Sequence, residues 1–104
     1  MAIEREQIIA TLRAHESELK AAGALSLSLF GSAARGDAGQ DSDVDVAVRL
    51  TEHFSSGGFD YFGSLAGLEH RLSRMLGCKV DVLEEPVRKP RLQMQIDKER
   101  ALAF

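Results

Sequence analysis

The chain is short: its 104 residues, 44% hydrophobic and 28% charged, give room for one small domain with a modest core. The formal net charge of −3 argues against broad binding to a nucleic-acid backbone, which requires a basic face, but leaves a small phosphorylated ligand held with a metal open. No apolar run is long enough to cross a membrane, no secretory signal is recognisable, and the single Cys78 cannot form an internal disulfide. We therefore expect a single domain over residues 1–104 and a cytoplasmic location.

Three segments have the composition of helices. Residues 4–22 contain no Gly or Pro and place apolar side chains near helical spacing, and Gly23 is expected to end this helix. Residues 59–76 repeat apolar side chains mostly every three or four positions, which is typical of an amphipathic helix. A third helix is expected over residues 91–102, after a connection that contains two prolines.

Three shorter segments alternate apolar and polar side chains, which is typical of strands with one buried face: residues 25–30, 43–50 and 78–83. In the second strand the valines share one face, and Asp43 and Asp45 share the other, because side-chain direction alternates with a period of two. The same alternation puts Asp81 on the polar face of the third strand. The polar face of the sheet therefore carries acidic side chains from two strands.

The connections between the strands predict the topology of the sheet. The first two strands are joined by a short link, which favours an antiparallel pair, and a full helix joins the second strand to the third, which favours a right-handed parallel crossover. We expect an α/β (α+β) two-layer domain with a mixed sheet of three to four strands, the second strand central, and the helices on one face. Phe30 and Leu83 would then lie on the open face, as candidate contacts for a base or a partner.

The aspartates predict chemistry because they converge. Asp43, Asp45 and Asp81 within a few ångström of one another would repel unless a proton or a cation joins them. Hard oxygen ligands suit Mg²⁺ or Mn²⁺, which are usually held by carboxylates together with the phosphates of a substrate. Gly31 and Ser32, at the rim of the same face, could bring a backbone N–H and a hydroxyl close to phosphate. The residues predict metal-dependent nucleotidyl or phosphoryl transfer, against the plainer alternatives of a solvated strand face and surface ion pairs.

The spacing of these residues also carries a resemblance. Gly31-Ser32, ten residues, Asp43-Val44-Asp45 and a later Asp81 match the pattern of the polymerase-beta-like nucleotidyltransferase superfamily. More closely, residues 30–36 followed by residues 41–45 resemble the minimal nucleotidyltransferase (MNT) domains of prokaryotes, of the antitoxin type. The resemblance covers nearly the whole chain and implies the nucleotidyltransferase fold.

What the resemblance implies can be carried over residue by residue. Asp43 and Asp45 would be ligands of Mg²⁺ (or Mn²⁺), and Asp81 would be the third carboxylate, which holds the metal on the nucleophile side and helps to deprotonate the acceptor. Gly31 and Ser32 would contact the triphosphate of ATP.

Arg35 has two interpretations that the sequence leaves open. It could contact phosphate, or it could form a structural ion pair with Asp37 or Asp41.

The resemblance further implies a partner. MNT proteins are commonly encoded beside small helical HEPN-domain proteins as toxin–antitoxin pairs, and some transfer AMP from ATP to a tyrosine of the toxin. This chain would then be a Mg²⁺-dependent nucleotidyltransferase, an antitoxin that modifies a hydroxyl of its partner. Two alternatives stay open: a non-catalytic antitoxin that binds nucleotide and neutralises the toxin by occlusion, and a small-molecule nucleotidyltransferase of the antibiotic-modifying kind. Whether the chain also forms a homo-oligomer is left open as well.

Overall fold

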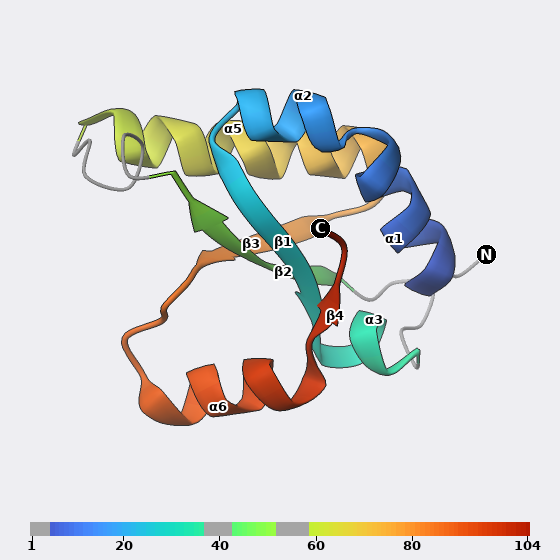
Figure 1. Cartoon of the computed structure of the whole chain (residues 1–104), viewed down its shortest axis with the longest axis vertical. Helices are drawn as coiled ribbons and strands as arrows, with labels where there is room; N and C mark the ends of the chain where they lie inside the picture. Colours follow the sequence, from blue (N-terminus) through green and yellow to red (C-terminus); the bar gives the residue numbers. More distant parts are fainter. Residues whose placement is uncertain (1–4, 37–42, 52–58) are drawn as a thin grey trace.

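In the computed structural model, the described residues are 5–36, 43–51 and 59–104, and the side chains of residues 59–64 are outside that set. The elements follow in the order α1 (Arg5–Ala14), α2 (Glu16–Ala21), β1 (Ala24–Phe30), α3 (Gly31–Arg35), β2 (Val44–Leu50), α5 (Phe59–Leu76), β3 (Val80–Glu84), α6 (Pro90–Glu99) and β4 (Ala101–Leu102) (Figure 1). None of the helices in this part of the chain is long and apolar enough to cross a membrane.

The strands form one mixed sheet in the order β3-β2-β1-β4. As predicted, β1 and β2 are antiparallel, β2 and β3 are parallel, and β2 is internal. The register pairs Phe30 with Asp45 across the first pair of strands, and Asp45 with Asp81 across the second. This register brings Asp45 and Asp81 together at one end of the sheet, beside the last residue of β1.

One face of the sheet carries the main core, as the alternation predicted. Helices α1, α2 and α5 cover it, and its fully buried large side chains are Ile8, Leu12, Leu19, Leu27, Leu29, Val44, Val46, Val48, Leu68, Leu72 and Val80. Burial of each such side chain is worth roughly 1.5–3 kcal/mol relative to exposure. The single helix expected over residues 4–22 is divided at His15, so that α1 and α2 lie at different angles over the strands (Figure 1).

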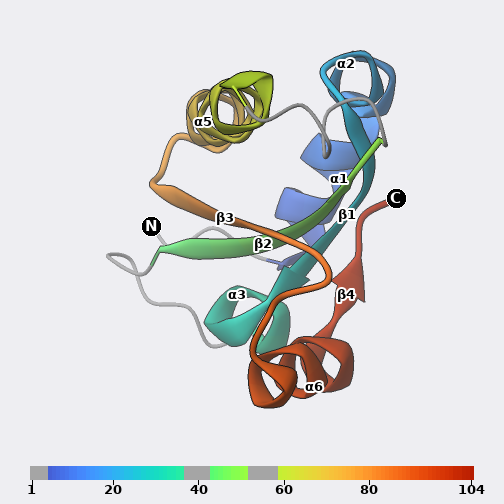
Figure 2. The same cartoon turned by 90° about the vertical axis from the view of Figure 1, so that its left-hand side faces the viewer.

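The second face is not left open, which corrects the expectation that all helices lie on one side. Figures 1 and 2 show α6 on the side of the strands opposite α5 and α2. There Ile96 packs against Phe30 and Ala47 in a small second cluster. Phe30, expected to be an exposed contact, is only 9% exposed because α6 covers it, whereas Leu83 remains 36% exposed.

The edge of β1 explains why the last helix is shorter than expected. The sequence predicts a helix through residue 102, but α6 ends at Glu99. The chain then pairs with β1, with Ser28 opposite Leu102 and Leu29 opposite Ala101. An unpaired strand edge offers a row of backbone donors and acceptors, and β4 satisfies part of it. At the other end of β1 an irregular register between Ala24 and Ser26 turns Leu25 outward, so that it is 57% exposed rather than in the core.

A buried ion pair holds α6 and β4 to the sheet. The Glu85 side chain is 1% exposed and receives two hydrogen bonds from Arg100, at 2.7 and 2.6 Å. Arg100 also donates to Ser28 Oγ at 2.9 Å, and Gln93 donates to Glu85 at 3.0 Å. The hydrogen bonds from Arg100, and then that from Gln93, outweigh burial and hold the pKa of Glu85 below its ordinary value. Strand β1, the end of β3, and α6 are thereby joined.

Arg100→Met is expected to lower the free energy of unfolding by about 3 kcal/mol near pH 7, because the buried Glu85 carboxylate loses both hydrogen bonds from Arg100 and keeps only the more distant cation of Arg49, at 4.0 Å. The lowered pKa of Glu85 means that its contribution is fully present above the ordinary glutamate pKa and is lost as the pH falls through the lowered value. In urea unfolding, the difference between wild type and variant should therefore shrink as the pH falls below the ordinary glutamate range.

Arg71→Met is the matched control, because Arg71 pairs with Glu18 at 3.4 Å between two side chains that are about half exposed. It should cost no more than about 1 kcal/mol. An equal cost for the two variants would show that the buried pair does not hold α6 in place.

Candidate active site

The candidate site lies where β1 runs into α3, beside the first residues of β2 and β3. Gly31 begins α3 directly after Phe30, the last residue of β1. Asp45 and Asp81 are each the second residue of their strands and are partners in the parallel register. The predicted convergence of the glycine turn with two strand aspartates is therefore present in the fold.

Gly31 is required at its position for two reasons. Its φ of +70° is in the left-handed region, which side chains disfavour, and a Cβ placed on it would lie 2.7 Å from Asp45 Oδ2. The Asp45 carboxylate thus rests directly on the backbone of the turn. Gly31 and Ser32 are both half-buried at the rim of the site.

Asp45 is in an unfavourable electrostatic environment. Partial burial, the neighbouring charge of Asp81 and then that of Asp43 raise its pKa, and the charge of Arg35 opposes them. Neighbouring strands lie ~4.8 Å apart, so partners in register on one face are close. A carboxylate in these surroundings favours a proton or a cation beside it.

Asp43 is less closely joined to the other two acids than predicted. It lies just before β2, and its carboxylate is 3.7 Å from Lys79 Nζ. Within residues 5–36, 43–51 and 65–104, no three carboxylate, imidazole or thiol groups are gathered closely enough to hold a metal ion. The chemistry of the site nevertheless fits a hard divalent cation. The Asp45 carboxylate offers oxygen donors, and the neighbouring charges of Asp81 and Asp43 disfavour its ionised form when no cation is bound.

Arg35 forms an ion pair that the sequence did not indicate. Its Nη1 lies 2.5 Å from Glu99 Oε2, at the end of α6, and 64 residues separate the two in sequence. Asp37 and Asp41, the ion-pair partners that the sequence suggests for Arg35, lie outside the described residues. Glu99 could not be found from sequence, because only the packing of α6 against α3 brings it to this turn.

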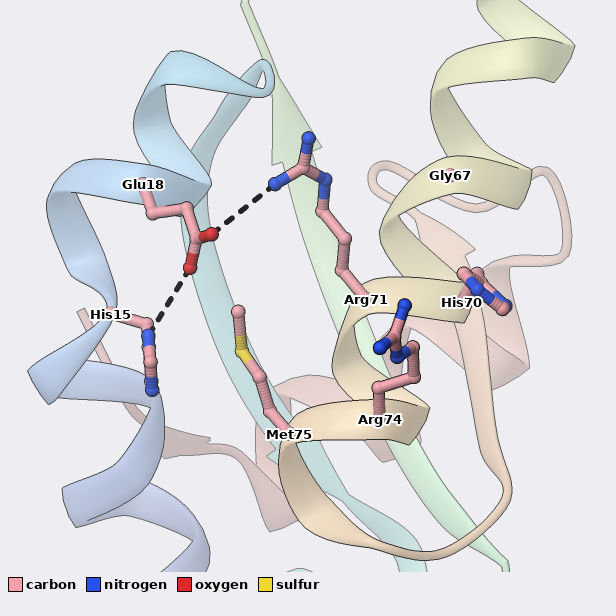
Figure 3. A pocket seen from close by; sticks show the side chains of 7 residues that line it. All are labelled: His15, Glu18, Gly67, His70, Arg71, Arg74 and Met75. Carbon is pink, nitrogen blue, oxygen red and sulfur yellow. Dashed lines mark hydrogen bonds and ion pairs between the residues drawn. The ribbon is translucent and has the colours of Figure 1, made fainter.

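A separate groove of about 500 Å³ lies between α2 and α5 (Figure 3). Its lining residues are His15, Glu18, Gly67, His70, Arg71, Arg74 and Met75. Both helices cover the apolar face of the sheet, so the strands separate this groove from Asp45. We do not assign it to the candidate site.

Comparison with known proteins agrees with this geometry. Residues 12–103 match the protein family described as the nucleotidyltransferase domain. The protein adenylyltransferase MntA of Thermococcus cleftensis is 38% identical over 79 residues, which cover 75% of this chain and 74% of that protein.

Two solved structures are similar in fold. One, described as a proposed minimal nucleotidyltransferase, superposes with a TM-score of 0.73 at 34% identity and covers 95% of both chains. A toxin–antitoxin structure with AMP-PNP superposes with a TM-score of 0.66 at 20% identity, over 98% of this chain and 73% of the other, which supports the fold alone.

Gly31→Ala should destabilise the chain more than Gly77→Ala does. Gly77 has nearly the same φ, +69°, but nothing lies within 4 Å of an added Cβ, so its variant isolates the backbone strain of about 1–2 kcal/mol. The excess cost at Gly31 reports the contact with Asp45, and Asp45→Ala should relieve it in the double variant. Urea unfolding of the wild type, the three single variants and the double variant measures this, and equal costs at both glycines would contradict the close approach.

Asp45→Asn is expected to stabilise the chain near pH 7 when no divalent metal is present, by a few tenths of a kcal/mol to about 1 kcal/mol because solvent screens a half-exposed group. A raised pKa means that the native state holds the proton more tightly. Stability therefore falls as the pH rises from the ordinary aspartate pKa through the raised one.

The gain from Asp45→Asn should disappear at a pH below the ordinary aspartate range, where the wild-type carboxyl is protonated in both states. Thermal unfolding in the presence of a chelator at the two pH values measures it. A loss of stability near pH 7 would show that Asp45 is not under repulsion.

Proposed function

Because the chain belongs to the nucleotidyltransferase domain family, we propose that it is a nucleotidyltransferase that moves AMP from ATP to a hydroxyl of a partner protein, with Mg²⁺ as its metal. The observation that carries this proposal is Asp45, held against the Gly31 turn and in register with Asp81. The protein adenylyltransferase activity in the name of the Thermococcus cleftensis relative supports a protein acceptor.

The residues have distinct roles in this reaction. Asp45 and Asp81 would hold the metal, and Asp43 would join them by releasing Lys79. The bound metal supplies charge neutralisation at the phosphates and at the attacking oxygen. Asp81 would also take up the proton of the acceptor hydroxyl while the hydroxyl oxygen attacks the α-phosphorus of ATP and pyrophosphate leaves. The Gly31 and Ser32 backbone and the Ser32 hydroxyl orient the triphosphate.

A toxin of the HEPN type is the proposed partner. The activity in the name of the relative, protein adenylyltransferase MntA, supports a protein partner, and a toxin–antitoxin structure has the same fold. Exposed apolar side chains are present on and beside the second face of the sheet, where a partner could pack: Leu83, Met94 and Leu102.

The reaction can be tested with ATP labelled at the α-phosphorus, Mg²⁺, the purified chain, and the HEPN-domain protein of the same organism. Label should appear on the HEPN protein, and Asp43→Asn with Asp45→Asn should reduce it by at least about 100-fold, because the metal accounts for several kcal/mol of transition-state stabilisation. Glu16→Gln, an acid paired with Lys20 on α2, is the control that should retain labelling.

Each other outcome has a defined meaning. Labelling that survives the double Asn variant would contradict the catalytic role of the aspartates. If no label transfers but the double variant still neutralises the toxin in cells, the chain acts by occlusion. Protection of cells against aminoglycosides would instead indicate a small-molecule acceptor.

A further inference from the structure

Glu99 places a carboxylate on Arg35, which ends the short helix α3 that begins at Gly31, beside the proposed triphosphate position. Its Oε2 pairs with Arg35 Nη1, its Oε1 accepts a hydrogen bond from Gln95 at 2.9 Å, and its side chain is only 15% exposed. The hydrogen bond from Gln95, and then the hydrogen bond and charge of Arg35, keep the pKa of Glu99 below the ordinary glutamate value. An anion of the chain itself therefore occupies the cation of Arg35, the last residue of the short helix that begins at Gly31.

Arg35 is placed between two anionic positions. It ends α3, which begins at Gly31 and packs against β2, and its charge opposes the raised pKa of Asp45, while its guanidinium pairs with Glu99. A triphosphate that reaches Gly31 would bring a higher negative charge to the same cation. Glu99 and the triphosphate would then repel each other and share one donor set.

The neighbouring contacts allow the Glu99 side chain to move while α6 stays in place. Arg100, the next residue, is fixed by its two hydrogen bonds to the buried Glu85 and by one to Ser28. A groove of about 670 Å³ beside Glu99 gives the side chain room, and a second cation lines it: Arg35, Met94, Gln95, Lys98 and Glu99.

We propose that Glu99 is an internal competitor of the triphosphate: its carboxylate binds the Arg35 guanidinium in the free protein and moves away from it when nucleotide binds. This inference rests on the proposed nucleotide site and adds a residue that sets its affinity. Glu99 keeps the cation of Arg35 oriented in the free protein, and nucleotide binding carries the cost of breaking this ion pair. The charge of Glu99 therefore tunes how tightly ATP is held.

The test is the dissociation constant of ATP with Mg²⁺, measured by isothermal titration calorimetry. Glu99→Gln keeps the size of the side chain but removes its charge, and it should tighten binding by about 3- to 10-fold. Glu99→Asp keeps the charge but is one methylene shorter, so it should fall between wild type and Glu99→Gln. In an Arg35→Gln background, Glu99→Gln should have a smaller effect, because the shared cation is gone.

Asp97→Asn is the matched control. It removes the same charge from α6, and Asp97 pairs with Arg100 rather than with Arg35. Its affinity should stay within about twofold of wild type, which separates direct competition from a change in net charge.

The outcomes separate this inference from the proposed function. If the wild type binds ATP and Glu99→Gln binds it equally or more weakly, the competitor role is overturned. The proposed nucleotide site is then retained. Equal tightening by Asp97→Asn also overturns it. If no variant binds ATP at millimolar concentration, the proposed nucleotide site is wrong, and the competitor role with it.

Discussion

The register of β2 between its two neighbours is the constraint on which the rest of the structure depends. The same strand pairs Phe30 with Asp45 on one side and Asp45 with Asp81 on the other. A shift of one residue would turn the aspartates into the core and the valines out of it. The apolar face therefore fixes the position of the acids as strictly as it fixes the core.

The acidic site is maintained against its own repulsion. Asp45 has a raised pKa, and its carboxylate lies against the Gly31 backbone. Both the ionised carboxylate and the left-handed glycine are therefore in locally unfavourable positions. The apolar layer of α1, α2 and α5 supplies the free energy that holds it there. Such local conflict with the general rules of folding is typical of sites selected for ligand binding.

Helix α6 gives the sheet a second layer and connects it to the site. Ile96 covers Phe30 and Ala47, Arg100 binds the buried Glu85, and Glu99 reaches Arg35. One short helix thus covers the sheet, joins the strands and contributes an anion to the rim of the site. The C-terminal segment therefore contributes both to the stability of the sheet and to the candidate site.

The sequence by itself determined the strand alternation, the helix of residues 59–76, the antiparallel and parallel pairings, and the grouping of Gly31, Asp45 and Asp81. These follow from period, turn residues and connection length, which are local properties. Tertiary structure alone decided that α6 covers Phe30, that residues 101–102 pair with β1, that Asp43 pairs with Lys79, and that Glu99 meets Arg35. Each of these contacts depends on which surfaces remain unpaired after the sheet has formed. A local sequence pattern contains no information about those surfaces.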